Sequence, residues 1–282
     1  MLFRSRRTLV HVRTPDGLFA EGLLRVSLAG GSALLDAGRN EDGWRHVGPA
    51  EVLRAAGLDA LAETPPDRLV VELAESATVP NRARLWLQGV LIMGAVTIET
   101  GGRLHASRAA IERVTIEQPH DRRPMPSLSA EDCLFDRITS LSGWAELVYC
   151  TVLGDVALER LHASDSIFAG TLSGVRCANR AGRPLTCIRF SRLPRDAEAP
   201  GCASAEAPTN TGRRPHFVQR YFPADPVCAL RIARYGEPGA GVLDTLAPRA
   251  IRAGAEDEGE MGAHHHLYLG AALTALERKL AD

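Results

Sequence analysis

The sequence LIMG at residues 91–94 returns in altered form four more times, as IERV at 111–114, LFDR at 134–137, TVLG at 151–154 and IFAG at 167–170. The five starts are 20, 23, 17 and 16 residues apart. Further short alternating segments lie between them, such as AVTIE at 95–99 and DVALE at 155–159. A unit of ~20 residues with several very short strands and no helix-length apolar face is typical of a stacked solenoid. We therefore predict a mainly β fold, a right-handed parallel β-helix, centred on residues 85–172.

The chain divides into three predicted parts. Residues 1–67 form an N-terminal strand-plus-helix cap, because the open end of a β-helix would otherwise expose strand edges. Within it we expect short strands, one of them at Ala33–Leu35, and one helix from Gly48 to about Ala62. Pro49 lies in the first turn of this helix, and Glu51 lies near its positive end. Residues 68–193 form the β-helix, in which Trp86 is either exposed or packed under the cap.

Residues 194–282 form a loop-rich C-terminal part. Four leucines near its end follow one another at spacings of 4, 3 and 4, which predicts an amphipathic helix over Leu267–Leu280. The segment 117–129 contains three prolines and breaks the repeat, so we expect a loop there. We expect this loop and the segment 194–216 to present contact surfaces.

Composition excludes several classes of protein. The net charge of −1 provides no broad basic field, so we expect neither nucleic acid nor an anionic membrane as a partner. The sequence contains no run of 18 apolar residues, so we expect no transmembrane helix. The N-terminus lacks the apolar stretch of a secretory signal. We therefore expect a cytoplasmic location.

None of the six cysteines forms a C-x-x-C pair, which argues against a zinc ribbon or a thioredoxin-like site. Cys133 and Cys150 occupy equivalent places in neighbouring repeats, which predicts a ladder of small buried side chains with reduced thiols. A disulfide between Cys202 and Cys228 is the less favoured alternative.

The C-terminal third contains three distinctive sequences: CIRFS at 187–191, RYGEPG at 234–239 and IRAGAEDEGEMGAHH at 251–265. In this order they resemble the ending of a family of uncharacterised bacterial β-helix proteins that often lie near phage-tail-like, contractile-injection-system genes. The resemblance covers about residues 85–266 and implies a β-helix with protein partners from such a particle. It implies no catalytic residues. The tail that follows the histidine pair in the family is longer than the one here.

The densest polar cluster offers a candidate metal site. Imidazole and carboxylate groups bind divalent metals, but ligands adjacent in sequence point apart on a strand or helix. The alternative is an acidic loop that caps backbone amides or pairs with Arg249 and Arg252, and we expect no cofactor. The candidate ligands are Glu256, Asp257, Glu260, His264, His265 and His266.

A second candidate site lies in the repeat. Asp136 and Asp155 fall near equivalent positions of successive repeats, where side chains on adjacent strands would lie ~5 Å apart. Two such carboxylates could share a proton, hold a cation or hydrolyse a glycoside. The alternative is that both are solvated turn residues. Trp144 and Tyr149 are the nearby aromatic residues that could stack on a sugar.

These patterns lead to three hypotheses. The leading one is a non-enzymatic structural or binding protein, an accessory of a phage-tail-like particle. The second is a polysaccharide lyase or glycoside hydrolase, with carbohydrate as its partner. The third is a scaffold that self-associates through the C-terminal helix or the open ends of the β-helix.

Overall fold

The computed structural model describes residues 2–5, 8–11, 23–28, 30–65, 68–117, 125–140, 142–178, 185–195, 197, 215, 217, 243, 247–263 and 265. Most of them lie in two long sheets whose neighbouring strands are largely parallel, and the few helices are short. The prediction of a mainly β fold is confirmed. No helix among the described residues combines the length and the apolar character needed to cross a membrane.

The first sheet has eight strands, and only its first pair is antiparallel. In spatial order it contains β4 (Arg39–Glu41), β5 (Trp44–Val47), β8 (Arg84–Gln88), β10 (Arg103–Ser107), β12 (Leu128–Glu131), β14 (Trp144–Val148), β17 (Arg160–Ser164) and β20 (Cys187–Arg189).

The second sheet has twelve strands and begins with an antiparallel β1–β2–β3 meander. Its remaining pairs are parallel, beginning with β3 against β6. The strands are β1 (Leu2–Ser5), β2 (Thr8–His11), β3 (Leu23–Leu28), β6 (Arg68–Leu73), β7 (Ala77–Val79), β9 (Leu91–Ile98), β11 (Ala110–Ile116), β13 (Leu134–Thr139), β15 (Thr151–Val152), β16 (Val156–Ala157), β18 (Ile167–Phe168) and β19 (Leu172–Ser173).

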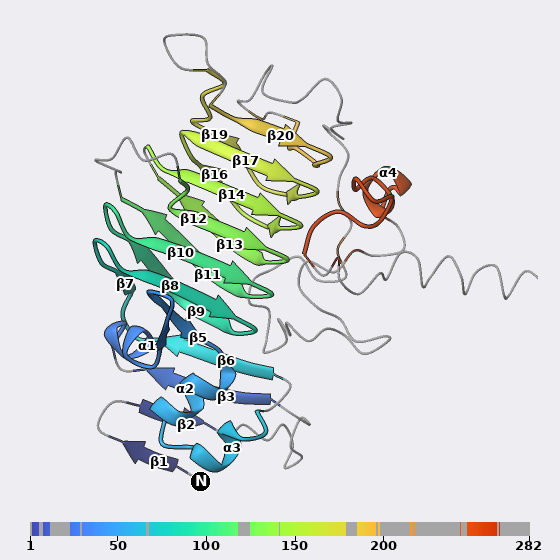
Figure 1. Ribbon diagram of the computed structural model, residues 1–282. Coiled ribbons are helices and arrows are strands. Elements are labelled where there is room, and N and C mark those ends of the chain that lie inside the picture. Colours follow the sequence, from blue (N-terminus) through green and yellow to red (C-terminus); the bar gives the residue numbers. More distant parts are fainter. Residues whose placement is uncertain are drawn as a thin grey trace, which may run out of the picture.

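From β8 onward the chain alternates between the two sheets. Each strand then pairs in parallel with its counterpart one repeat later, as β8 does with β10 and β9 with β11. Figure 1 shows these layers stacked along one axis, from β8 and β9 to β17 and β20. This connectivity is compatible with a β-helix or another solenoid.

The register agrees with four of the five repeat starts expected from sequence. Leu91, Leu134, Thr151 and Ile167 belong to one column of paired residues. The fifth member of the column is Ala110, so the predicted start at Ile111 is wrong by one residue. Ala110 and Ile111 are both fully buried, on opposite faces of the strand. When both faces of a strand are buried, its residues are apolar throughout, so the sequence pattern alone cannot fix the register to within one residue.

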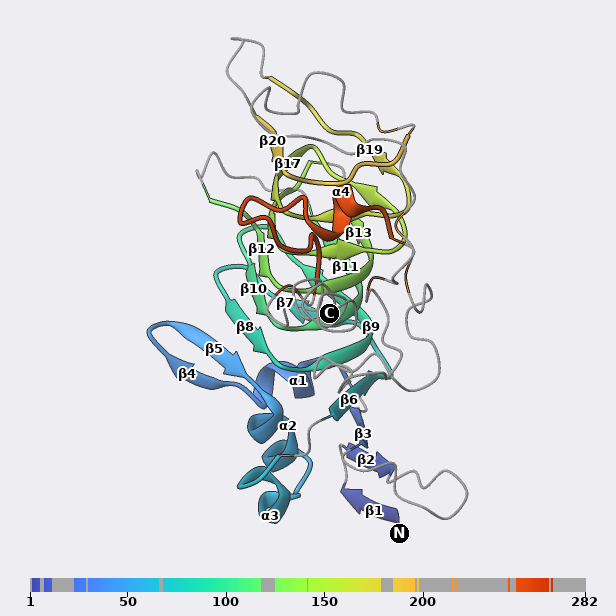
Figure 2. The same cartoon turned by 90° about the vertical axis from the view of Figure 1, so that its right-hand side faces the viewer.

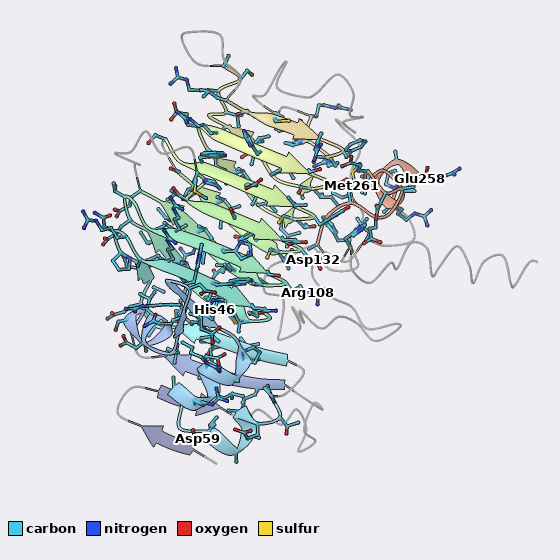
Figure 3. The ribbon with its side chains drawn as sticks, in the orientation of Figure 1. His46, Asp59, Arg108, Asp132, Glu258 and Met261 are labelled. Carbon is cyan, nitrogen blue, oxygen red and sulfur yellow. The ribbon has the colours of Figure 1, made fainter. Side chains whose placement is uncertain are left out.

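One corner of each repeat has a fixed backbone conformation. A single residue there adopts a φ between 46° and 64°, and the buried residue after it is small or β-branched. Backbone bonds stack these corners: Arg108 N–H donates to Glu131 O, and Asp132 N–H donates to Val148 O, both at 3.0 Å. Figure 3 shows Arg108 and Asp132 on the same edge of the stack. The corner residues are Gly89, Arg108, Asp132, Tyr149, Asp165 and Phe190.

Cys133 and Cys150 follow two of these corners, and both are fully buried free thiols, as the ladder prediction requires. Burial, with the neighbouring Cys133 thiol adding to it, raises the pKa of Cys150 well above its usual range. Cys177 departs from the expectation of reduced thiols, because it is one half of a disulfide. Cys202 and Cys228 lie outside the described residues.

Alternating side chains of both sheets fill the space between them. In the eight-stranded sheet, Leu85, Leu104, Leu128, Ala145 and Leu161 form one in-register buried column. In the twelve-stranded sheet, Ile92, Ile111, Phe135, Val152 and Phe168 form another. Stacked apolar columns of this kind bury a continuous core that no single repeat could form alone.

The N-terminal part contains α1 (Ser32–Asp36), α2 (Pro49–Ala55) and α3 (Asp59–Ala62). Figure 2 shows them at the end of the stack that carries β1–β3. The expected strand at Ala33–Leu35 is wrong. Leu34 and Leu35 are both buried, and the helix α1 lets these adjacent residues pack on the same side, which a strand cannot do.

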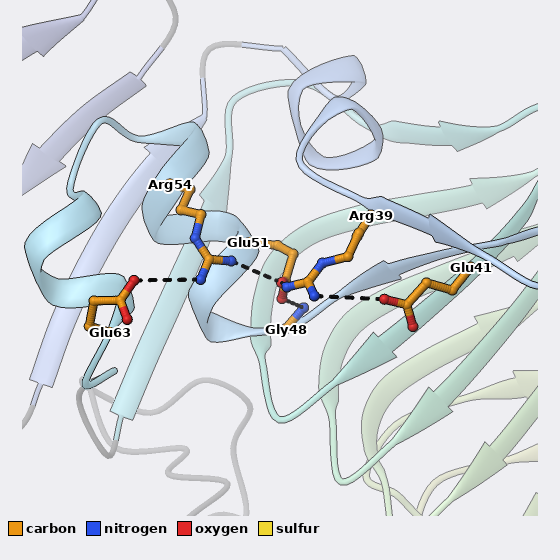
Figure 4. Close-up of polar contacts among 6 residues, drawn as sticks. All are labelled: Arg39, Glu41, Gly48, Glu51, Arg54 and Glu63. Atoms are coloured by element: carbon orange, nitrogen blue, oxygen red, sulfur yellow. Dashed lines mark hydrogen bonds and ion pairs between the residues drawn. The ribbon is translucent and has the colours of Figure 1, made fainter.

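The single helix expected from Gly48 to Ala62 is divided at Gly57. Gly57 has a φ of +73°, and Leu58 N–H donates to Leu53 O, which closes the end of α2. The start of α2 agrees with prediction: Gly48 N–H donates to the Glu51 carboxylate at 3.1 Å. Figure 4 shows that this carboxylate also binds Arg39 and Arg54, which connects the hairpin β4–β5 to the helix.

Residues 247–263 run beside the stack and include α4 (Arg249–Arg252). Their buried members Ile251, Ala255 and Met261 pack on Ile167, and Ala263 packs with Leu91 and Leu134. This contact explains why the repeats carry a second apolar residue that points away from the core. The predicted helix over Leu267–Leu280 lies outside the described residues.

Candidate binding face

The eight-stranded sheet presents a row of polar and aromatic side chains on the face opposite the core. Its strands alternate between buried and partly exposed residues, so every second side chain points outward. We call this outward surface the Trp–His face and define it by Trp44, His46, Arg84, Trp86, Arg103, His105, Ser127, Ser129, Glu131, Trp144, Glu146, Arg160 and His162.

Strand register arranges the Trp–His face in columns. One column contains His46, Trp86, His105, Ser129, Glu146 and His162, each opposite the next on the neighbouring strand. A second column, two residues earlier on each strand, pairs Arg84 with Arg103 and Trp144 with Arg160. Ser127 lies between these pairs, since its carbonyl accepts from Leu104 N–H and its own N–H donates to Trp144 O.

The rings of the first column contact one another. The Trp86 ring lies 4.7 Å from that of His46 and 4.8 Å from that of His105, measured between centroids. Because His46 lies on β5, Trp86 packs against the N-terminal part, which is one of the two expected positions. Trp144 and His162 make a separate edge-to-face pair at 5.3 Å. Such pairs contribute about 0.5–1.5 kcal/mol each.

Charges on this face are mixed. The Arg84 guanidinium lies 5.9 Å from the centroid of the Trp44 ring, which is within cation–π range. Burial lowers the pKa of His105, although the exposed carboxylates of Glu131 and Glu146 act in the opposite direction. His105 is therefore neutral at pH 7 and can both donate and accept a hydrogen bond.

A shallow pocket lies at the edge of the Trp–His face, at the N-terminal ends of the strands, where the residues of the second column lie. Arg103, Ser127, Trp144 and Arg160 come from four successive repeats and form one side of it. The turns that precede these strands complete it, with Gly101, Gly102, Met125, Pro126, Ser142 and Glu159. Met125 and Pro126 belong to the loop predicted over 117–129, of which residues 118–124 lie outside the described chain. The end of this prediction is wrong by two residues, because Leu128 and Ser129 already belong to β12.

Asp136 and Asp155 lie on the other sheet, away from this pocket. The residue directly opposite Asp136 is Glu112, because Ile111 pairs with Phe135 and Arg113 with Arg137. Asp155 accepts hydrogen bonds from the backbone N–H (3.3 Å) and the hydroxyl (2.7 Å) of Thr171, and it lies 3.8 Å from Arg137. The two aspartates are thus close in space but one position apart in register.

Their protonation behaviour differs. Burial raises the pKa of Asp136, and the neighbouring carboxylates of Glu112 and Asp155 add to this effect. The hydrogen bonds from Thr171 lower the pKa of Asp155. Glu112 is already used structurally, since its carboxylate accepts from Gly94 N–H at 2.7 Å. Asp136 is thus the carboxyl group in this cluster with a raised pKa.

The described members of the candidate metal cluster at residues 256–266 take part in separate contacts. Glu256 N–H donates to the Asp165 carboxylate at 2.6 Å, while the Glu256 side chain points toward Arg189 at 3.8 Å. His265 stacks on Tyr149 with a centroid distance of 3.8 Å and lies 2.9 Å from the Asp257 carboxylate. Its other ring nitrogen lies 2.7 Å from Glu260 O.

Glu260 is buried, and one of its carboxyl oxygens has no hydrogen-bond partner among the described residues. Burial raises the pKa of Glu260 to about 8, against the opposing effect of Arg252. The described residues contain no group of three or more His, Cys, Asp or Glu side chains placed to hold a metal ion. His264 and His266 lie outside the described residues, so the metal hypothesis stays untested for the complete set.

Sequence reasoning singled out Trp86 and Trp144 but missed the rest of the Trp–His face. A signal was present: the pentapeptide RLHAS occurs at 103–107 and again at 160–164. These copies are β10 and β17, and they place Arg103, His105, Arg160 and His162 at equivalent positions of the face. In the two repeats between these copies, the equivalent positions hold four different residues, which hide the repeat: Ser127, Ser129, Trp144 and Glu146.

Comparison with known proteins found no matching family model, no similar curated protein and no similar solved structure.

Proposed function

We propose that this chain is a right-handed parallel β-helix that serves as a non-enzymatic binding protein, and that its Trp–His face binds a polysaccharide lying along the stack. The observation that carries this proposal is the in-register alignment of aromatic, imidazole and guanidinium groups over successive strands. Adjacent strands are ~4.8 Å apart, so one residue of each column meets the ligand at each step along the axis.

The chemistry of the face suits a sugar chain. Indole rings offer flat apolar surface to the C–H faces of a pyranose, and Ser, His and Glu side chains exchange hydrogen bonds with hydroxyl groups. A binding site of this kind needs a rigid support. The core columns beneath the face supply it, because Leu85, Leu87, Leu104 and Ala106 are all buried.

Binding without cleavage is supported by the position of Asp136 and Asp155, the two candidate catalytic carboxylates. Asp136 and Asp155 lie on the twelve-stranded sheet, and Asp155 and Glu112 already accept hydrogen bonds from the protein. A polysaccharide on the Trp–His face would lie on the opposite side of the core from them.

The test is affinity electrophoresis of the protein in gels that contain individual neutral or acidic polysaccharides, followed by assays for new reducing ends and for unsaturated products. We expect at least one polysaccharide to retard the protein without being cleaved. Trp86→Ala should reduce the retardation, whereas Arg137→Ala, on the other sheet, should not. Absence of retardation by the whole panel would reject the proposal.

A glycoside hydrolase or lyase is the second candidate function. The observation in its favour is the raised pKa of Asp136 beside Glu112, since a protonated carboxyl group next to a second carboxylate is the arrangement of a general acid. The same product assays test it. Cleavage by the wild type that Asp136→Asn abolishes would favour the enzyme over the binding protein.

The association with a phage-tail-like particle, as its accessory, is also a proposal. It is supported by the resemblance of residues 187–191, 234–239 and 251–265 to proteins found near such genes. The protein should then co-sediment with sheath or baseplate components and lose this property when residues 267–282 are deleted. Oligomers that form without any partner would instead favour the self-assembling scaffold.

A further inference from the structure

We infer that the pocket formed by Arg103, Ser127, Trp144 and Arg160 is a subsite for a uronic acid residue, so that the polysaccharide bound by the Trp–His face is acidic. This inference rests on the proposed function and specifies its ligand. A tryptophan and two arginines line this pocket together.

Register fixes the spacing of these groups. Trp144 and Arg160 lie on adjacent strands, and Arg103 is two strands before Trp144. The two arginines are therefore three strand spacings apart, or roughly 14 Å along the stack. A sugar ring on Trp144 would have one guanidinium beside it and another a short distance along the chain. Arginine binds carboxylates through two parallel hydrogen bonds, which gives geometric selectivity as well as affinity.

The electrostatics of the pocket favour an anion. Glu159 is the one carboxylate among the described residues that line it, and Arg176 binds that carboxylate at 2.7 Å. No described carboxylate forms an ion pair with Arg160 or Arg84. Arg84 and Arg160 thus carry positive charge that no described carboxylate neutralises by direct pairing.

The tryptophans supply an independent observation. In the described residues, the buried side-chain nitrogens without a hydrogen-bond acceptor are the indole N–H groups of Trp86 and Trp144. Buried donors of this kind normally have a partner. Both belong to the Trp–His face, and Trp144 also lines the pocket.

A polysaccharide fits the whole face better than a nucleic acid does. The exposed carboxylates of Glu131 and Glu146 lie beside the pocket on the same face. Sugar hydroxyls can donate hydrogen bonds to these carboxylates, whereas the phosphate groups of a nucleic acid carry no donor and cannot. The uronate carboxylate would then contact the arginines of the second column, and the hydroxyl groups of the sugar would face Glu131 and Glu146.

The test is calorimetric titration of the full-length protein with matched oligosaccharides. One pair is tetramannuronate and β-1,4-mannotetraose, and the other is tetragalacturonate and its fully methyl-esterified form. We expect at least one uronate to bind tenfold or more tightly than its uncharged counterpart. Arg160→Ala should weaken that uronate tenfold or more, Arg160→Lys less, and Trp144→Phe severalfold.

Controls separate the outcomes. Arg137→Ala removes an exposed arginine from the other sheet and should leave affinity unchanged, and circular dichroism verifies the fold of each variant. Equal binding of charged and uncharged oligosaccharides, still weakened by Trp86→Ala, would overturn the uronate subsite but keep the glycan-binding function. No binding of any oligosaccharide or polysaccharide would overturn both. Equally tight, Arg160-dependent binding of a twelve-residue oligothymidylate would replace the uronate site with a general polyanion site.

Discussion

At the scale of single residues, Glu260 is a buried carboxyl group whose burial raises its pKa strongly. Its pKa of about 8 in the folded protein lies far above the ordinary value of 4.5. Between these two values the unfolded chain loses a proton that the folded chain keeps, so stability falls as pH rises through that window. We predict that Glu260→Gln stabilises the protein at pH 7 by about 1–3 kcal/mol, as measured by denaturant unfolding.

The wild type and Glu260→Gln should have equal free energies of unfolding near pH 4, where Glu260 is protonated in both the folded and the unfolded wild-type chain. Glu258→Gln removes a charge from an exposed position of the same segment and serves as the control. A constant difference between wild type and Glu260→Gln across pH 4–8 would contradict a buried, protonated Glu260.

At the scale of elements, Asp165 holds residues 247–263 against the stack. Its carboxylate accepts from Glu256 N–H at 2.6 Å, and its backbone carbonyl accepts from Gly262 N–H at 2.7 Å. The side chain is almost fully buried, so its loss leaves the Glu256 N–H without this acceptor. We predict that Asp165→Ala speeds amide hydrogen exchange in residues 250–263 by about tenfold or more while the strands stay protected.

The matched control is Asp155→Ala, which removes an aspartate bound to Thr171 and has no described contact with the C-terminal segment. If both variants accelerate exchange in residues 250–263 equally, Asp165 does not hold the segment. Ala also strains the corner, where Asp165 has a φ of +56°. Asp165→Gly tolerates that conformation but also lacks the acceptor, so it separates the lost hydrogen bond from the strain.

At the scale of the whole molecule, the repeat was readable from sequence because short strands and corners recur at nearly constant spacing. The paired apolar residues, such as Leu134 with Phe135, predicted strand positions correctly, since each is buried on one face of β13. The sequence could not show that residues 247–263 cover the outer member of each pair. That contact joins segments about 90–170 residues apart, and no local pattern encodes it.

The candidate sites were harder to predict for a similar reason. The sequence correctly suggests that Asp136 and Asp155 lie near each other. It does not reveal the bulge between Ile111 and Arg113 or the bond from Thr171 to Asp155, because both depend on the strand register. The Trp–His face is built from one or two residues per strand, and only the RLHAS duplication marks it locally. Helix boundaries failed where Gly57 allowed a left-handed residue inside an otherwise helical pattern.

Stacked repeats depend on their neighbours, so damage to one layer should weaken the whole. Phe135 is fully buried and lies between Ile111 and Val152 in its column. We predict that Phe135→Ala lowers the free energy of unfolding by about 3–5 kcal/mol and that all probes of unfolding shift together. Circular dichroism and tryptophan fluorescence during denaturant unfolding provide the measurement. Unfolding of one end with the other end unchanged would contradict a continuous core.

The central claim is that the Trp–His face binds a polysaccharide. Hydroxyl-radical footprinting, with and without the polysaccharide that retards the protein most strongly, tests it most directly. Binding should protect Trp86 and Trp144 from oxidation and leave Tyr149, which lies against His265 beside the C-terminal segment, unchanged. Protection of Tyr149 with no change at the two tryptophans would place the ligand elsewhere and contradict the claim.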